Sequence, residues 1–297
     1  MHTPSKNAWL GNSPSNRTAE AGSFVLVVML ILSLGAGVAA ADEGWHVTVD
    51  AGAYAANTYV GSDESFVSPL PAVRATRGVG NTTWFVSLPL EGVGVSHRDP
   101  QSGMTSRLSV NFGGLRSPDE YSVVGFTVEH SDRVRSLLAG SPEVTTPLVL
   151  EASVEYPVPL GSIGASVGYH PTRVDSARAD GTDEFFHGFV LSVQYTSFVP
   201  VTRKLAVGSV LGFDVMDGNH AEAWYSVSQQ TEHLAAFSAE AGPQDARVTI
   251  FASYQVAPNV SVSAVYQNMF LLADAADSPY TFDERQQTFL LRTSYSF

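Results

Sequence analysis

Hydrophobic and polar residues alternate with a period of two over most of the chain after residue 42. At the end of the chain, one face would carry Phe289, Leu291, Thr293, Tyr295 and Phe297, and the other Leu290, Arg292, Ser294 and Ser296. The same alternation recurs at 108–112, 148–156, 189–195 and 246–254. Successive side chains of a strand point to opposite faces, so these segments predict strands with one apolar and one polar face. We therefore expect an all-β fold.

Two architectures could use such strands. A soluble sandwich would bury the apolar faces, whereas an outer-membrane barrel would turn them to lipid and keep the polar faces in its lumen. Strands of about ten residues, aromatic residues near their ends and alternately short and long connections favour the barrel. An exposed apolar strand at the chain end would promote aggregation of a soluble protein but is tolerated in a membrane.

The pattern predicts an antiparallel up-and-down transmembrane barrel of about twelve strands. They are expected at 44–55, 66–77, 82–96, 104–115, 120–130, 145–157, 161–173, 185–198, 204–216, 245–256, 259–272 and 287–297. The expected short turns are 78–81, 116–120, 158–161, 199–203 and 257–259, and the expected long connections are 56–65, 97–103, 131–144, 175–184, 217–244 and 274–286. Segment 120–130 is the weakest strand, and ten strands would remain if one hairpin stayed outside the membrane. Pro69 and Pro71 cannot donate ladder hydrogen bonds, so we expect them at an edge, a bulge or a strand end.

The first 41 residues predict a cleavable signal peptide with a long amino-terminal region. An uncharged apolar run spans 23–41 and ends in Ala39-Ala40-Ala41, which fits the A-x-A cleavage pattern. The run is short for a membrane span, and no basic flank follows it. The mature barrel is therefore expected to be 42–297, exported to the outer membrane of a Gram-negative cell.

Composition excludes several kinds of chemistry. The chain has no cysteine, which removes disulfides, thiolate nucleophiles and Cys-ligated metals. A net charge of −13 without a basic patch argues against nucleic acid as a partner. Hydrophobic residues make up 44% of the chain, yet mean hydropathy is only +0.04. Strands that face lipid on one side and water on the other would produce this average.

Three strings resemble the MipA/OmpV family of outer-membrane proteins, named for a protein that interacts with a murein-degrading lytic transglycosylase. The segment Leu271-Leu272-Ala273-Asp274-Ala275-Ala276-Asp277-Ser278-Pro279 looks like the hairpin before the family's last strand. The family's first loop is similar to Tyr59-Val60-Gly61-Ser62-Asp63-Glu64 with Pro69 and Pro71. A later loop of the family is similar to Tyr225-Ser226-Val227-Ser228 with Asp245. The terminal strand, with Phe289, Leu291, Tyr295 and Phe297, resembles the signal that the barrel assembly machinery recognises.

The resemblance implies a non-enzymatic scaffold that brings a lytic transglycosylase together with a murein synthase, in contact with membrane lipid and lipopolysaccharide. It supplies no catalytic set and no cofactor. It also implies that Asp274 and Asp277 hydrogen-bond the backbone of their own loop as Asx-type turns beside Pro279. The alternatives are a small diffusion channel of the same architecture and a surface adhesin.

One string has the form of a hydrolase nucleophile elbow. Gly164-Ala165-Ser166-Val167-Gly168 matches G-x-S-x-G, but the elbow needs a strand-to-helix turn, and here the strand pattern continues. Ser166 and His170 would share a face about 13 Å apart, at roughly 3.3 Å per residue, beyond proton-transfer reach. The acidic loops, with Asp175, Asp180, Asp183 and Glu184 or with Asp274, Asp277, Asp283 and Glu284, lack calcium-loop spacing, so we interpret them as solvated charge.

Several charged residues are expected to point into the lumen. They are Asp50, Glu91, Arg107, Glu129, Glu151, Glu155, Arg247 and Arg292. A charge there must be paired or hydrated. Since no single sign lines the inner faces, we favour a lumen partly plugged by side chains and the 217–244 connection over a selective pore.

Overall fold

The computed structural model describes residues 44–123, 126–175 and 183–297. The expected signal peptide at 1–41 lies outside these residues, so it stays a prediction. No helix in the described part of the chain is long and apolar enough to cross a membrane.

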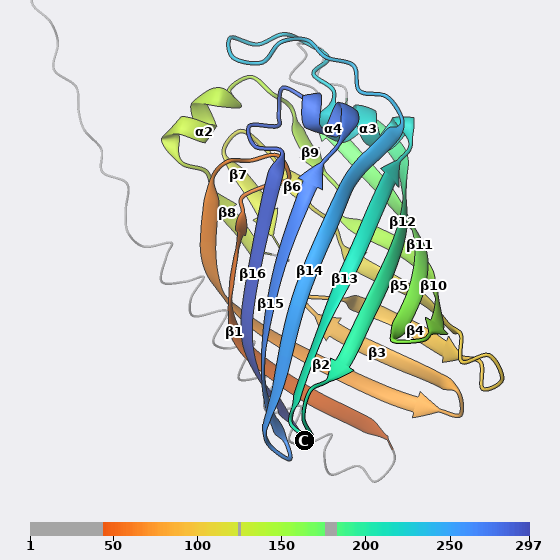
Figure 1. Cartoon of the computed structure of the whole chain (residues 1–297). Coiled ribbons are helices and arrows are strands. Elements are labelled where there is room, and N and C mark those ends of the chain that lie inside the picture. Colours follow the sequence, from red (N-terminus) through yellow and green to blue (C-terminus); the bar gives the residue numbers. More distant parts are fainter. Residues whose placement is uncertain (1–43, 124–125, 176–182) are drawn as a thin grey trace, which may run out of the picture.

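Twelve antiparallel strands close into a barrel (Figure 1). In chain order they are β1 (Trp45–Asn57), β2 (Ser65–Val79), β3 (Thr82–Leu88), β4 (Gly92–Arg98), β5 (Thr105–Phe112), β10 (Leu148–Val158), β11 (Gly161–Asp175), β12 (Glu184–Pro200), β13 (Leu205–Met216), β14 (Gly242–Ala257), β15 (Val260–Leu271) and β16 (Arg285–Ser296). Each strand pairs with the next, β5 pairs with β10, and β1 pairs with β16 to complete the ring. The all-β up-and-down barrel predicted from the alternation is confirmed.

The expected number of strands is confirmed, but two of the twelve segments were wrong. The segment 82–96, expected as one strand, is the hairpin β3–β4, and its turn is closed by the Glu91 amide donating to the Ser87 carbonyl over 3.0 Å. Pro89 has no N–H for a ladder and Gly92 adopts a positive φ of 68°, which together favour a turn. The segment 120–130 is not a barrel strand. The total is nevertheless right. The sequence predicted one strand at 82–96, where the structure has two, and it predicted a barrel strand at 120–130, where the structure has none.

The insertion between β5 and β10 builds a small sheet of its own. It contains β6 (Leu115–Arg116), β7 (Glu120–Val123), β8 (Phe126–Glu129), α2 (Asp132–Leu137) and β9 (Glu143–Thr145). β9 pairs with the end of β11, and β6, β7 and β8 follow in that order across the small sheet. The small sheet thereby continues the barrel wall from β11, beyond the ends of the short strands β3, β4 and β5. The connection 97–103 therefore lies at the end of the barrel that carries the short turns, and 116–120 lies at the opposite end, the reverse of what the sequence predicted.

Pro69 and Pro71 lie in β2, opposite Ala53 and Ala51 of β1. On the other side of β2, the β3 partners begin only at Val73. On that side, this stretch of β2 is therefore an unpaired edge, where a residue without an N–H costs no ladder hydrogen bond. An edge is one of the three positions that the sequence predicted for these prolines.

The apolar faces point outward. Ile250 is 57% exposed and Leu291 45%, and the alternating apolar residues at 108–112, 148–156 and 189–193 are exposed in the same way. The intervening residues face the lumen, where Asp50 and Ser109 are buried. Phe289, Leu291, Tyr295 and Phe297 share the outer face of the last strand, and the Phe297 amide donates to the Val47 carbonyl over 2.9 Å. Their role as an assembly signal stays a prediction.

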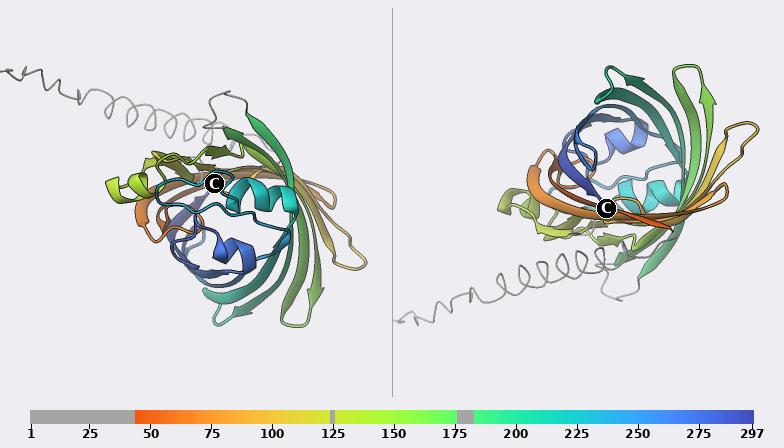
Figure 2. Two further views of the ribbon diagram at one scale, coloured as in Figure 1. Left: turned by 90° about the horizontal axis from the view of Figure 1, so that it is seen from above. Right: turned by 90° about the horizontal axis from the view of Figure 1, so that it is seen from below.

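A cap occupies one end of the lumen. We use "cap" for the loop 58–64, the insertion 113–147, the connection 217–241 with α3 (Gly218–Tyr225) and the connection 272–284 with α4 (Ala273–Asp277). Seen from above, α3 and α4 lie inside the ring of strands (Figure 2). Two apolar clusters hold the cap together: one joins α3 and α4 to Val190 and Met216 of the wall, and the other joins Tyr59 and Tyr280 to residues of α2.

We expect a charge on the outer face of β16 to destabilise the barrel, whereas the same charge on its inner face should have less effect. Leu291→Arg places a guanidinium in lipid and should lower the free energy of unfolding by about 2–4 kcal/mol. Leu290→Arg is the matched control because its neighbour Arg292 is already accommodated in the lumen. Equilibrium unfolding by guanidinium in lipid vesicles measures both, and equal losses would contradict the assigned faces.

Candidate functional site

The three segments that resemble the family meet in the cap. The Tyr59 hydroxyl donates to the Tyr280 carbonyl over 3.2 Å, and the Ser278 hydroxyl donates to the Tyr225 carbonyl over 2.7 Å. The Gly61 carbonyl accepts from the amides of Phe282 at 2.6 Å and Asp283 at 3.0 Å. Gly61 has a positive φ of 102°, which favours glycine. Segments more than 150 residues apart in the chain thus form one hydrogen-bonded unit.

The individual motif residues have unequal roles. Ser62 is fully buried and accepts from the Thr58 hydroxyl over 2.7 Å. Ala275 is also fully buried, in the apolar cluster that joins α3 and α4 to the wall, and Ala276 packs against that cluster. The carboxylate of Asp274 accepts from the Glu240 amide over 2.7 Å, so it joins two loops and does not form a turn within its own.

Other motif residues make none of the hydrogen bonds named above. Asp277 is exposed and Pro279 half-buried. Pro69 and Pro71 lie in β2, away from the cap hydrogen bonds. Asp245 lies in the wall, on the lumen side.

Helix α3 docks directly on the inner wall. The Asp217 amide donates to the Phe189 carbonyl over 2.9 Å, and the Asp217 carboxylate caps the helix by accepting from the His220 amide over 2.8 Å. Gly188 permits this approach, because a β-carbon there would lie 2.8 Å from the His220 Cα. The His220 ring meets the His170 ring of β11 with centroids 4.8 Å apart. Burial, with a smaller contribution from His170, lowers the pKa of His220 to about 3.

Several of the inward charges of the wall form ion pairs with one another. Arg247 contacts Asp214 at 2.5 Å and Asp245 at 3.2 Å. Elsewhere in the lumen, Arg292 lies 3.7 Å from Asp50, and Glu91 contacts Arg107 at 3.1 Å and Arg74 at 3.6 Å. The structure contradicts one expected lumen charge, because Glu129 lies on β8, exposed and outside the barrel wall. The roles of Asp214 and Arg74 were missed, because a lone charge in a strand does not reveal its cross-strand partner.

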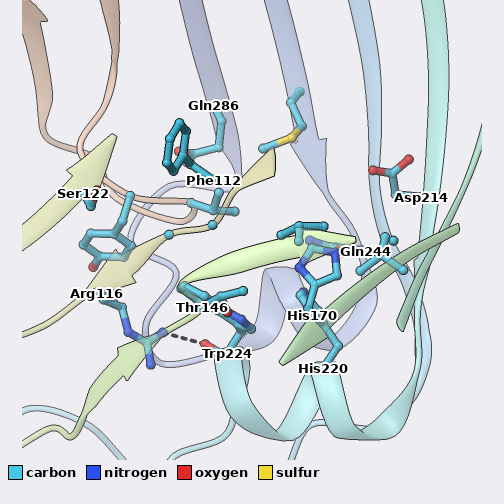
Figure 3. A pocket seen from close by; sticks show the side chains of 18 of the residues that line it. Phe112, Arg116, Ser122, Thr146, His170, Asp214, His220, Trp224, Gln244 and Gln286 are labelled. Carbon is cyan, nitrogen blue, oxygen red and sulfur yellow. Dashed lines mark hydrogen bonds between the residues drawn. The ribbon is translucent and has the colours of Figure 1, made fainter. Parts of the chain in front are cut away.

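A cavity of about 590 Å³ lies in the lumen beneath the cap. Arg116, Phe112, His170, His220, Trp224 and Gln286 are among its lining residues (Figure 3). Arg116 was expected in a short turn; its place in the cavity follows from the insertion sheet, which the sequence did not predict.

The segment with Ser166 forms no nucleophile elbow. Strand β11 runs unbroken from Gly161 to Asp175, and Ser166 lies opposite Ser153 and Ser192. Ser166 and His170 both line the cavity, as their shared face predicted. The His170 ring, however, packs against His220.

The acidic loops hold ion pairs and hydrogen bonds. Arg173 contacts Asp175 at 2.6 Å and Asp183 at 3.1 Å, while Asp180 lies outside the described residues. Asp283 accepts from the Arg285 amide over 2.8 Å. Within 44–123, 126–175 and 183–297, no three His, Asp or Glu residues are grouped so that they could hold a metal ion.

The docking of α3 should weaken in acid. The pKa of docked His220 lies below the ordinary value of about 6.5. The free energy by which docking stabilises α3 is therefore constant above about pH 6.5 and decreases as the pH falls below it. At pH 5 the loss should be about 2 kcal/mol, because the released imidazole takes up a proton that the docked one excludes. Limited proteolysis of the connection 217–241 at pH 7.5 and pH 5 measures this release.

Two variants test the assignment. His220→Gln should reduce the acid sensitivity, although His130, a second buried imidazole of the cap, also has its pKa lowered by burial and retains part of it. His233→Gln changes an exposed imidazole of the same connection and should behave as wild type. Equal acid sensitivity in all three proteins would contradict the role of His220.

Comparison with known proteins places the chain in a family. The family model described as "MltA-interacting protein MipA" matches residues 49–297, whereas no curated protein matches the chain. Among solved structures, the translocator domain of the autotransporter NalP from Neisseria meningitidis is 12% identical, with a TM-score of 0.48, and the alignment covers 94% of this chain and 98% of that one. An outer membrane channel from Pseudomonas putida F1 is 12% identical, with a TM-score of 0.45, covering 87% of this chain and 97% of that one. Since the family match runs from within β1 to the end of the chain, this chain belongs to the MltA-interacting protein MipA family and is a β-barrel of the Gram-negative outer membrane.

Proposed function

We propose that this protein is a non-enzymatic adaptor of the outer membrane that brings a lytic transglycosylase together with a murein synthase. The family description supports the first partner, because it names an interaction with MltA. The second partner rests on the family resemblance of the sequence motifs. The nonenzymatic part is supported by the position of Ser166 within a continuous strand.

The observation that carries this proposal is the cap over the lumen. Segments from four parts of the chain are joined by hydrogen bonds such as Tyr59 to Tyr280, Ser278 to Tyr225, and Glu240 to Asp274. These contacts hold the cap together over one end of the lumen. A barrel closed in this way contributes its outer surface and its rim, which suits an adaptor better than a pore.

The short-turn end of the barrel carries exposed apolar side chains in two of its turns. Leu160, in the turn after β10, is 78% exposed and has a φ of 67°, and Val201, in the turn after β12, is 55% exposed. A positive φ is unusual for a bulky side chain, and an exposed leucine there contributes nothing to the barrel interior. With both termini on the periplasmic side, these turns face the murein.

Site-specific photocrosslinking in intact cells tests the adaptor proposal. A photoreactive amino acid at Leu160 or Val201 should capture a lytic transglycosylase, because these side chains extend from the proposed periplasmic rim. The same amino acid at Val60, which is 45% exposed at the opposite end, is the matched control and should not. Recovery of no murein enzyme from either turn position would count against the proposal.

A diffusion channel is the second candidate, and the lumen cavity favours it. About 590 Å³ of space lies beneath the cap, and inward charges such as Arg292 and Asp50 give the lumen a polar wall. In this alternative, release of the cap would be the gating step.

Planar-bilayer recording separates the two candidates. Wild-type protein should show no conductance steps, because α3 and the rest of the cap lie across one end of the lumen. A variant in which residues 218–240 are replaced by a short Gly-Ser linker should conduct, since Met216 and Gly242 are paired neighbours and such a linker can join them. Steps from the wild type would favour the channel, and a silent deletion variant would show that α3 is not what blocks the lumen.

A further inference from the structure

The lumen cavity carries hydroxyl groups that are open and have no partner within the protein. Ser166 of β11 and Ser192 of β12 are cross-strand neighbours, and both line the cavity. Each residue is half-buried, and its hydroxyl oxygen is open to solvent. Among the residues that the structure describes, neither hydroxyl forms a hydrogen bond. Each of the two can therefore both donate to and accept from a ligand in the cavity.

Two further side chains present an open polar atom to the same cavity. Glu151 accepts from Asn111 through Oε2 over 3.2 Å, while its Oε1 has no donor in the described part of the chain. Gln267 of β15 accepts from Thr249 through Oε1 over 3.3 Å, while its Nε2 has no acceptor there. Glu151 and Gln267 are half-buried and line the cavity. The cavity thus offers a further acceptor and a further donor.

Gly168 lies at the centre of the polar groups on β10 and β11. It follows Ser166 by two residues on the same face and is paired with Glu151. The His170 imidazole reaches back over it, since a β-carbon at Gly168 would lie 2.9 Å from the His170 Nε2. The ring nitrogens of His170 have no hydrogen-bond partner within 44–123, 126–175 and 183–297. A hydroxyl, a carboxylate oxygen and an imidazole therefore meet at one position of the wall.

Aromatic rings supply an apolar part of the lining. Tyr54 of β1 and Trp224 of α3 both line the cavity, and both are half-buried (Figure 3 shows Trp224). The face of an aromatic ring carries partial negative charge, which suits contact with C–H groups. Aromatic faces combined with hydroxyl and amide groups fit a ligand that has C–H faces and a hydroxylated rim.

The charges around the cavity favour a neutral ligand. Asp214 is already paired with Arg247 at 2.5 Å. An anion would meet the open oxygen of Glu151 on the wall. A cation would meet the guanidinium of Arg116 in the cap, and it would leave the serine hydroxyls without an acceptor. A neutral molecule with several hydroxyl groups satisfies the open donors and acceptors and adds no charge to a partly desolvated site.

We propose that the capped lumen binds a neutral sugar of one or two rings. Its hydroxyls would bond Ser166, Ser192 and Glu151, and one ring face would pack against Trp224. The cavity volume of about 590 Å³ lies within the range of small-molecule sites, roughly 300–1,000 Å³. From below, α3 and α4 are visible through the ring of strands, and we expect the sugar to enter from that end (Figure 2). This inference goes beyond the adaptor role and does not depend on it, since it concerns the lumen and not the periplasmic rim.

Isothermal titration calorimetry on the full barrel tests the proposal, in a detergent without a sugar headgroup. The probe is N,N′-diacetylchitobiose, a neutral disaccharide with hydroxyl and amide groups. It should bind saturably with a Kd below about 1 mM. Benzoate and benzyltrimethylammonium, an organic anion and an organic cation, should both bind more weakly than the disaccharide, because each leaves most of the open polar groups without a partner.

Serine variants locate the site. Ser166→Ala and Ser192→Ala should each weaken disaccharide binding roughly 2- to 10-fold, the range of one net hydrogen bond, and the double variant roughly tenfold or more. Ser153→Ala is the matched control, because Ser153 is paired with Ser166 on the same face but does not line the cavity. It should bind as wild type. The mobility of unheated samples on gels shows whether each variant is folded.

Three outcomes would overturn the proposal. The first is no saturable binding of the disaccharide by the wild type. The second is tighter binding of either charged probe, which would make the cavity a site for ions. The third is a wild-type affinity in both single serine variants, or a loss in Ser153→Ala as large as theirs.

Discussion

The structure depends on one constraint: in the hydrocarbon of a membrane, every backbone N–H and C=O must find its partner within the protein. An open sheet would leave two unpaired edges in lipid, and the ring closed by β1 and β16 removes them. The short strands β3 and β4 show how the constraint is met where the wall is interrupted. There the insertion sheet continues the pairing from β11, and the remaining edge of β2 carries Pro69 and Pro71, which have no N–H to leave unpaired.

The same insertion forms part of the cap and lines the lumen cavity. It places Arg116 within the cap, next to a helix that comes from a connection about a hundred residues later in the chain. The cap in turn is a meeting point of loops, and its contacts depend on glycine where backbones approach closely, as at Gly61 and Gly188. Fold and site are therefore coupled: the segment that completes the wall also lines the cavity.

The cap is also the region where polar groups are least satisfied. His220 is held neutral between α3 and the wall, Arg116 is charged without a carboxylate, and Trp224 has a free indole donor. On the wall strands, Arg247 and Glu91 each have two partners, although Asp50 and Asp214 each keep one carboxylate oxygen without a donor. Buried polar groups normally have partners, so the unsatisfied groups of the cap are exceptions within the fold.

The sequence by itself determined the barrel and the outward face of most of its strands, because a period of two is a local property of the chain. It also restricted Pro69 and Pro71 to an edge, a bulge or a strand end. It also indicated which segments resemble the family, although not that three of them touch. Only the tertiary structure decided that 82–96 is a hairpin, that 120–130 lies outside the ring, and that Arg116, Trp224 and His220 share a cavity. The alternation of side chains continues through the turn at Pro89 and through the hairpin β7–β8, so the local pattern could not separate them from spanning strands. The partners of Arg116 lie more than a hundred residues away, and closure of the ring, which no local pattern encodes, is what brings them together.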